Sequence, residues 1–73
     1  MEIKVYYARK QRGISTRTLA RRTGLSLGTI NNIENEKTSP TMHSMEKIAK
    51  ALEVAIEDLY ESDYKYTGKK RSE

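Results

Sequence analysis

The sequence predicts an all-α fold for this chain of 73 residues. Apolar side chains recur at steps of three and four residues in several short segments, which is the spacing of a helix with one buried face. Serine or threonine stands before three of these segments, and both residue types cap free N–H groups where helices begin. Since no segment shows a convincing strand pattern, we expect a compact domain built from five short helices.

The first helix is expected from about residue 3 to residue 12. In this phase Val5 and Ala8 face the interior, with Arg9 beside them. Gly13 then ends the helix, because glycine readily adopts the left-handed backbone that closes many helices. The other basic residues of this segment are expected to be solvated charges: Lys4, Lys10 and Arg12.

The second and third helices, expected over residues 16–23 and 27–35, carry the most informative pattern. Ala20 leaves room for these helices to cross closely, and Gly24 supplies a left-handed turn between them. A serine caps the start of each helix: Ser15 and Ser26. Four aliphatic side chains fill the space between them: Leu19, Leu25, Ile30 and Ile33. So tight a turn leaves one face of the later helix projecting, and in a basic protein such a helix can enter a major groove.

A fourth helix follows the linker that ends in Pro40, since proline cannot lie inside a helix. Thr41 caps it, and the helix runs to about residue 52. Its inner face is expected to consist of five apolar residues: Met42, Met45, Ile48, Ala49 and Leu52. A short fifth helix is expected over residues 56–60, and it adds two more apolar side chains: Ile56 and Leu59.

Residues 1–61 are expected to form one domain, followed by a charged, tyrosine-containing and partly mobile tail at residues 62–73.

The charge of the chain is unevenly distributed along the sequence. The net charge is +4, yet residues 1–22 hold seven basic and one acidic residue, whereas residues 23–60 hold three basic and six acidic ones. This division is typical of a molecule with one side facing a polyanion, although a merely lopsided solvated surface would give it too.

Several classes of protein are disfavoured by what the sequence lacks. Without cysteine there are no disulfides or thiolate zinc sites, and the single histidine, His43, gives no basis for a metal site. No apolar run reaches the roughly 20 residues of a membrane span, and no signal-peptide pattern opens the chain. The acidic residues form no paired-carboxylate or nucleophile–base arrangement, so we expect neither an enzyme nor a cofactor. A cytoplasmic binding protein is the remaining expectation.

From Val5 to Tyr60 the sequence resembles the Cro/cI-type helix-turn-helix family of bacterial and phage repressors, often called XRE-like. The matching pieces occur in order and with almost no change of spacing: ARKQRGIS, STRTLARRTGLS, GTINNIENEKTSP and TMHSMEKIAKALEVAIEDLY. The resemblance implies a compact five-helix, lambda-repressor-like domain with its helix-turn-helix at helices 2 and 3. It also implies binding to double-stranded operator DNA as a homodimer.

The resemblance further implies roles for individual residues. One face of the third helix would read bases in the major groove: Leu27, Gly28, Thr29, Asn31 and Asn32. The start of the second helix and the loop after the third would contact phosphates: Ser15, Thr16, Arg17, Asn35, Lys37 and Thr38. An ion pair between Arg9 and Glu34 would hold the first helix onto the reading helix.

Some of these positions have more than one reading. Asn32 can both donate and accept, which matches the major-groove edge of adenine, but it could also be an ordinary solvated side chain. Leu27 fits a thymine-methyl contact and a place in the core equally well. Two of three arginines should approach phosphates, and the sequence leaves open which two: Arg17, Arg21 and Arg22.

Two glutamates depart from the pattern of the family. Glu36 and Glu53 stand where relatives commonly carry glycine, so a left-handed backbone at either position would cost about 1 kcal/mol. Glu36 also brings negative charge near the expected DNA surface, which makes the geometry of that loop a question for the structure.

The leading interpretation is a sequence-specific transcriptional regulator, a repressor, that binds an inverted-repeat operator. The alternative is an antitoxin-type or other protein-interaction module that binds a promoter and contacts a protein partner through the tail. The dimer interface is hypothesised to include Leu59, Tyr60 and the tail tyrosines, Tyr64 and Tyr66, because aromatic residues are enriched in such patches. A monomer with a local aromatic cluster is the competing interpretation.

Overall fold

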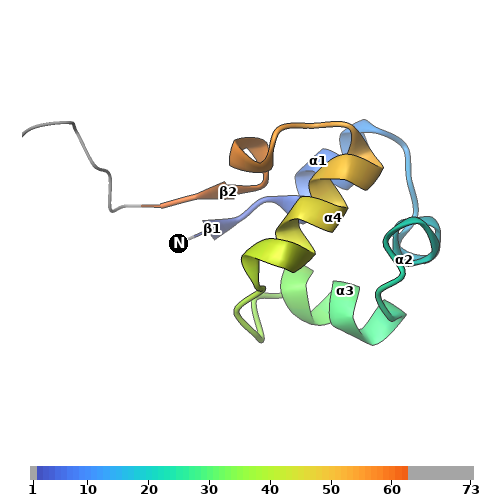
Figure 1. Ribbon diagram of the computed structural model, residues 1–73, viewed down its shortest axis with the longest axis horizontal. Helices are drawn as coiled ribbons and strands as arrows, with labels where there is room; N and C mark the ends of the chain where they lie inside the picture. Colours follow the sequence, from blue (N-terminus) through green and yellow to red (C-terminus); the bar gives the residue numbers. More distant parts are fainter. Residues whose placement is uncertain (1, 63–73) are drawn as a thin grey trace, which may run out of the picture.

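The computed structural model describes residues 2–62 (Figure 1). Within this range the chain forms four α-helices, a 3₁₀ helix and two very short strands. In chain order these are β1 (Glu2–Ile3), α1 (Val5–Gln11), α2 (Thr16–Thr23), α3 (Leu27–Glu34), α4 (Met42–Leu52), η1 (Ile56–Leu59) and β2 (Tyr60–Glu61). The expected helical architecture is therefore confirmed in its main features. The tail expected at residues 62–73 lies outside the described residues, apart from Ser62.

The hydrophobic core draws on every helix. Figure 1 shows α4 in the middle of the domain, with α3 below it and α2 at the right of the view. The largest fully buried side chains are Val5, Leu19, Ile30, Ile33, Ile48, Leu52 and Leu59. Complete burial of such a side chain is worth about 1.5–3 kcal/mol relative to exposure. Ala20 and Leu25 are partly buried against this core, as close crossing of α2 and α3 requires.

The helix starts follow the capping residues of the sequence. The hydroxyl oxygens of Ser15, Ser26 and Thr41 each accept a hydrogen bond from the backbone N–H three residues later. Gly24 ends α2 with φ of 78°, in the left-handed region. Thr23 adds a contact that the sequence did not reveal: its buried hydroxyl donates to the Leu19 carbonyl at 2.9 Å and accepts from the Leu25 N–H at 3.2 Å. The turn between α2 and α3 is thus fixed on both sides of the glycine.

The expectation of a chain without strands is wrong. Ile3 pairs with Tyr60 and Glu2 with Glu61 in an antiparallel ladder, which joins the two ends of the described chain. Because Ile3 belongs to this ladder, α1 begins at Val5 and not at residue 3. A ladder of two residues per strand is too short to show an alternating pattern in sequence. Beside it, the hydrogen bond and negative charge of Glu61, 3.0 Å from the Lys4 ammonium, raise the pKa of Lys4.

The expected fifth helix forms as a 3₁₀ helix and not as an α-helix, so the described residues contain four α-helices. Residues Ile56–Leu59 make a single 3₁₀ helix, in which the Asp58 N–H donates to the Ala55 carbonyl. Tyr60 turns into the extended backbone of β2 instead of continuing the helix. Pairing with β1 therefore limits this helical segment to four residues.

Two residues expected in buried or interface positions lie elsewhere. Met42 is 60 % exposed, because the apolar stripe of α4 runs beyond the core at the N-terminal end of the helix. Met45, on the same stripe, is buried as expected. Leu59 has no exposed surface, so it belongs to the core of the single chain and cannot form part of an exposed dimer patch.

Glu36 and Glu53 both adopt the left-handed backbone, with φ of 57° and 58°. Replacing Glu53 by glycine should stabilise the domain by about 1 kcal/mol, because the steric cost of a side chain in this conformation disappears. The Glu53 carbonyl, which accepts from Arg12 Nη2 at 2.9 Å, is kept in that variant. Urea denaturation would measure the gain.

The matched variant Glu36→Gly should gain less than Glu53→Gly. It relieves the same backbone strain, but it also removes the carboxylate that accepts from the Ile3 N–H at 3.2 Å. Such a hydrogen bond contributes about 0.5–1.5 kcal/mol. Equal gains from the two substitutions would show that the Glu36 side chain contributes nothing to stability.

Candidate nucleic-acid interface

The third helix presents one face to the core and the opposite face to solvent. Ile30 and Ile33 are buried, and they anchor α3 against the rest of the domain. The residues on the other side of the helix are exposed: Leu27, Gly28, Asn31, Asn32 and Asn35. This surface, called the α3 outer face below, is a projecting ridge of polar and small side chains.

Four of the five residues expected to read bases lie on the α3 outer face. Leu27 is 36 % exposed, so the structure favours its surface interpretation over the core one. No residue within 2–62 forms a hydrogen bond with the carboxamide of Asn31 or Asn32. Thr29, the fifth residue, is half-buried at the edge of the face, and its hydroxyl accepts from the Ser26 hydroxyl at 2.8 Å. Among the five residues expected to read bases, Asn31 and Asn32 are therefore the polar side chains that are both exposed and unbonded within residues 2–62.

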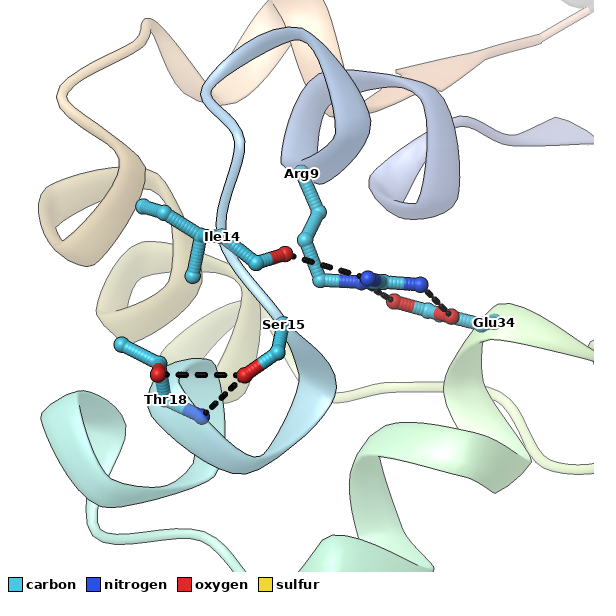
Figure 2. Close-up of polar contacts among 5 residues, drawn as sticks. All are labelled: Arg9, Ile14, Ser15, Thr18 and Glu34. Atoms are coloured by element: carbon cyan, nitrogen blue, oxygen red, sulfur yellow. Dashed lines mark hydrogen bonds and ion pairs between the residues drawn. The ribbon is translucent and has the colours of Figure 1, made fainter.

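The residues expected to contact phosphates belong to the start of α2 and to the segment that follows α3. Five of the six are exposed: Ser15, Arg17, Asn35, Lys37 and Thr38. Thr16 is half-buried. The Ser15 hydroxyl is already engaged at the start of α2, where it donates to Thr18 Oγ1 and accepts from the Thr18 N–H, both at 3.1 Å (Figure 2).

The three arginines of α2 point in different directions. Arg22 turns toward α4, with Nη1 3.4 Å from the Ala51 carbonyl. Arg21 stays along its own helix, with Nη2 3.5 Å from Thr18 Oγ1. Arg17 is exposed near the start of α2 and has no hydrogen-bond partner in the described part of the chain. Arg22 is therefore a contact between helices, whereas Arg17 and Arg21 form no hydrogen bond outside α2 within residues 2–62.

A buried ion pair joins α1 to α3. Arg9 Nε donates to Glu34 Oε2 at 2.7 Å, and Nη2 donates to Glu34 Oε1 at 3.1 Å, so the guanidinium and carboxylate meet side by side (Figure 2). Their side chains are only 9 % and 8 % exposed. The remaining guanidinium nitrogen, Nη1, donates to the Ile14 carbonyl at 3.1 Å, and the Tyr6 ring lies 5.3 Å from the Arg9 carbon Cζ. This pair fixes α3 at its C-terminal end.

In the loop after α3, the carboxylate of Glu36 is directed at β1. Its Oε2 accepts from the Ile3 N–H, on the edge of β1 that does not pair with β2. Lys37 and Thr38 stay exposed in the same loop. Sequence reasoning missed this contact because 33 residues separate the partners. The family pattern, which commonly has glycine at this position, gave no signal for it either.

Two short helices joined by a fixed glycine turn, the second with a solvent-facing ridge, define a helix-turn-helix domain of the DNA-binding class. A family model described as helix-turn-helix matches residues 5–59. The chain therefore belongs to the XRE-type helix-turn-helix family, a family of DNA-binding regulators. A comparison with curated proteins found no match.

A metal-binding cluster and a membrane-spanning helix are both absent from residues 2–62. Between residues 2 and 62, no group of three or more histidine, cysteine, aspartate or glutamate side chains is arranged to hold a metal ion. No helix in the same range is long and apolar enough to cross a lipid bilayer.

Proposed function

We propose that this protein is a transcriptional repressor that binds a specific inverted-repeat operator as a homodimer, in the cytoplasm. Its α3 outer face lies in the major groove and reads base edges there. The observation that carries this proposal is the ridge itself: α3 is anchored by Ile30 and Ile33, while Asn31 and Asn32 project from it without partners in the described chain. A repressor of this kind acts by occupying its operator.

The charges around the ridge support binding to a polyanion. Arg17 and Arg21 lie on the exposed side of α2, and Lys37 follows α3. The acidic residues at the end of α3 are engaged: Glu34 is paired with Arg9, and Glu36 is bonded to β1. The exposed cations would set the register of the protein on the phosphate backbone.

The proposed dimer has a geometric consequence for its operator. Two α3 helices on one side of B-DNA must be about 34 Å apart, or one helical turn, to enter successive major grooves. The operator should therefore be an inverted repeat with half-site centres about 10 base pairs apart. Selection of bound duplexes from a random library, with the full chain, would identify the site and test the proposal. Recovery of duplexes without any common sequence would contradict it.

Replacing Arg17 by alanine should weaken binding to every duplex by the same factor. It should also make the slope of log affinity against log salt concentration shallower by about 0.9, because one phosphate is no longer neutralised. Fluorescence anisotropy titrations with labelled operator and scrambled duplexes, at several salt concentrations, would measure both effects.

Arg22→Ala is the matched control for Arg17→Ala. It removes the same charge from the same helix, but Arg22 is directed at the Ala51 carbonyl and not at the flank of α3. Its salt slope should equal that of the unaltered protein. An unchanged slope for Arg17→Ala, or an equal reduction in both variants, would place the phosphate-binding side of α2 elsewhere.

A further inference from the structure

We propose that the α3 outer face reads A·T base pairs: the carboxamides of Asn31 and Asn32 bind adenine, Leu27 contacts a thymine methyl, and no guanine is read directly. This inference rests on the function proposed above and names the class of sequence that the helix selects. It is carried by the chemistry of the exposed side chains, by their freedom from internal contacts and by the absence of a side chain at Gly28.

The α3 outer face contains no side chain suited to guanine. Guanine presents two acceptors, O6 and N7, and is most often bound by two donors from arginine or lysine. From Leu27 to Asn35 the sequence holds neither residue type. A carboxamide has one donor group and one acceptor, which complement N6 and N7 of adenine. The polar side chains of the α3 outer face thus select adenine over guanine.

The asparagines have no competing partners in the structure. The side chains of Asn31 and Asn32 are exposed, and no hydrogen bond from residues 2–62 restrains them. Thr29 differs, because its hydroxyl already accepts from the Ser26 hydroxyl. Binding of a base edge by Asn32 would therefore break no bond within the described protein.

A short asparagine can reach a base only if the helix backbone comes close to the DNA. Gly28 lies one turn before Asn32 on the same face. A Cβ built at Gly28 would have Ser26 Oγ, at 4.0 Å, as its nearest neighbour, so nothing inside the protein requires a glycine there. Because Gly28 has no side chain, the backbone of α3 can approach the edge of the DNA groove closely. Leu27 and Asn32 then come within reach of the bases.

The test begins with duplexes selected from a random library by the full chain and by Asn32→Ala. The position at which the variant loses selectivity should be an adenine, and loss of one bidentate contact should weaken binding there by about 5-fold to 150-fold. Substituting 7-deaza-adenine at this position, which removes N7, should weaken the unaltered protein and leave Asn32→Ala unaffected. Asn35→Ala is the matched control, since a phosphate contact should weaken all duplexes equally.

Leu27 is tested by replacing thymine with deoxyuridine, which differs only by the methyl group. At one position this change should weaken the unaltered protein by about 4-fold, the value of one buried methyl-sized group, and should not affect Leu27→Ala. Guanine at the position governed by Asn32, or equal sensitivity of Asn32→Ala to 7-deaza-adenine, would overturn the inference while leaving the proposed function intact. Selection of no common sequence would overturn the proposed function itself.

Discussion

Replacing Glu34 by alanine is expected to destabilise the domain by about 3–5 kcal/mol, the largest effect among the substitutions considered. The guanidinium of Arg9 would remain buried with only the Ile14 carbonyl and the face of Tyr6 beside it. A charge without its counter-ion in the protein interior carries a large desolvation penalty. Since small domains have net stabilities of about 5 kcal/mol or somewhat more, much of the chain should unfold. Chemical denaturation followed by circular dichroism would measure the loss.

The double variant Arg9→Met/Glu34→Met separates two explanations of that loss. If the penalty comes from the unpaired charge, removing both charges should recover most of the stability, because apolar side chains of similar size can replace a buried ion pair. If the loss reflects packing of α1 on α3 alone, the single variant Glu34→Met, which restores the side-chain volume but leaves Arg9 unpaired, should recover as much stability as the double variant. A loss below 1 kcal/mol for Glu34→Ala would contradict the burial of the pair.

Replacing Leu59 by alanine should cost about 2–5 kcal/mol, the second largest effect expected. The side chain is fully buried in the core of one chain, so its truncation leaves a cavity. The midpoint of thermal unfolding should fall, and the fall should be the same at every protein concentration. Scanning calorimetry over a wide concentration range would test both statements.

Met42→Ala provides the control for Leu59→Ala. Met42 is 60 % exposed at the start of α4, so its truncation should change stability by no more than about 0.5 kcal/mol. A Leu59→Ala protein whose destabilisation grew on dilution would place Leu59 between two chains, contrary to its burial within one. Equal losses from both truncations would contradict the difference in burial.

The four α-helices could be predicted because the signals that define them are local. Ser15, Ser26 and Thr41 satisfy N–H groups only three residues away, and Gly24 adopts the left-handed turn that its missing Cβ allows. The boundaries of α2 follow from these signals alone. The ridge of α3 follows from its period, because Ile30 and Ile33 are the residues that its buried face requires.

Two features that the sequence did not predict, the β1–β2 ladder and the Glu36 contact, depend on partners far away in the chain. The β1–β2 ladder forms because Ile3 meets Tyr60, and this pairing both shortens α1 and ends η1. Glu36 has a bonding partner only once the fold has brought Ile3 to it. The period of α4 placed Met42 on the inner face, but it could not show where the covering helices end.

Within the proposed site, too, the local features could be predicted from the sequence and the contacts between distant segments could not. The spacing of polar residues on α3 was enough to assign its outer face, and the family pattern supplied the pairing of Arg9 with Glu34. The sequence could not distinguish Arg22 from Arg17 and Arg21, because Arg22 differs only in its contact with the Ala51 carbonyl near the end of α4. The tertiary structure thus decides which basic side chains are free to contact a ligand.

The small ladder between β1 and β2 makes the domain nearly closed on itself. Since Glu2 and Glu61 are paired neighbours, a short peptide bridge could join them, and the backbone could then be cut in an exposed loop without separating any helices that pack together. Circular permutants of this protein should accordingly keep the native arrangement. Such a result would mean that the contacts between the helices, and not their order along the chain, determine how they pack.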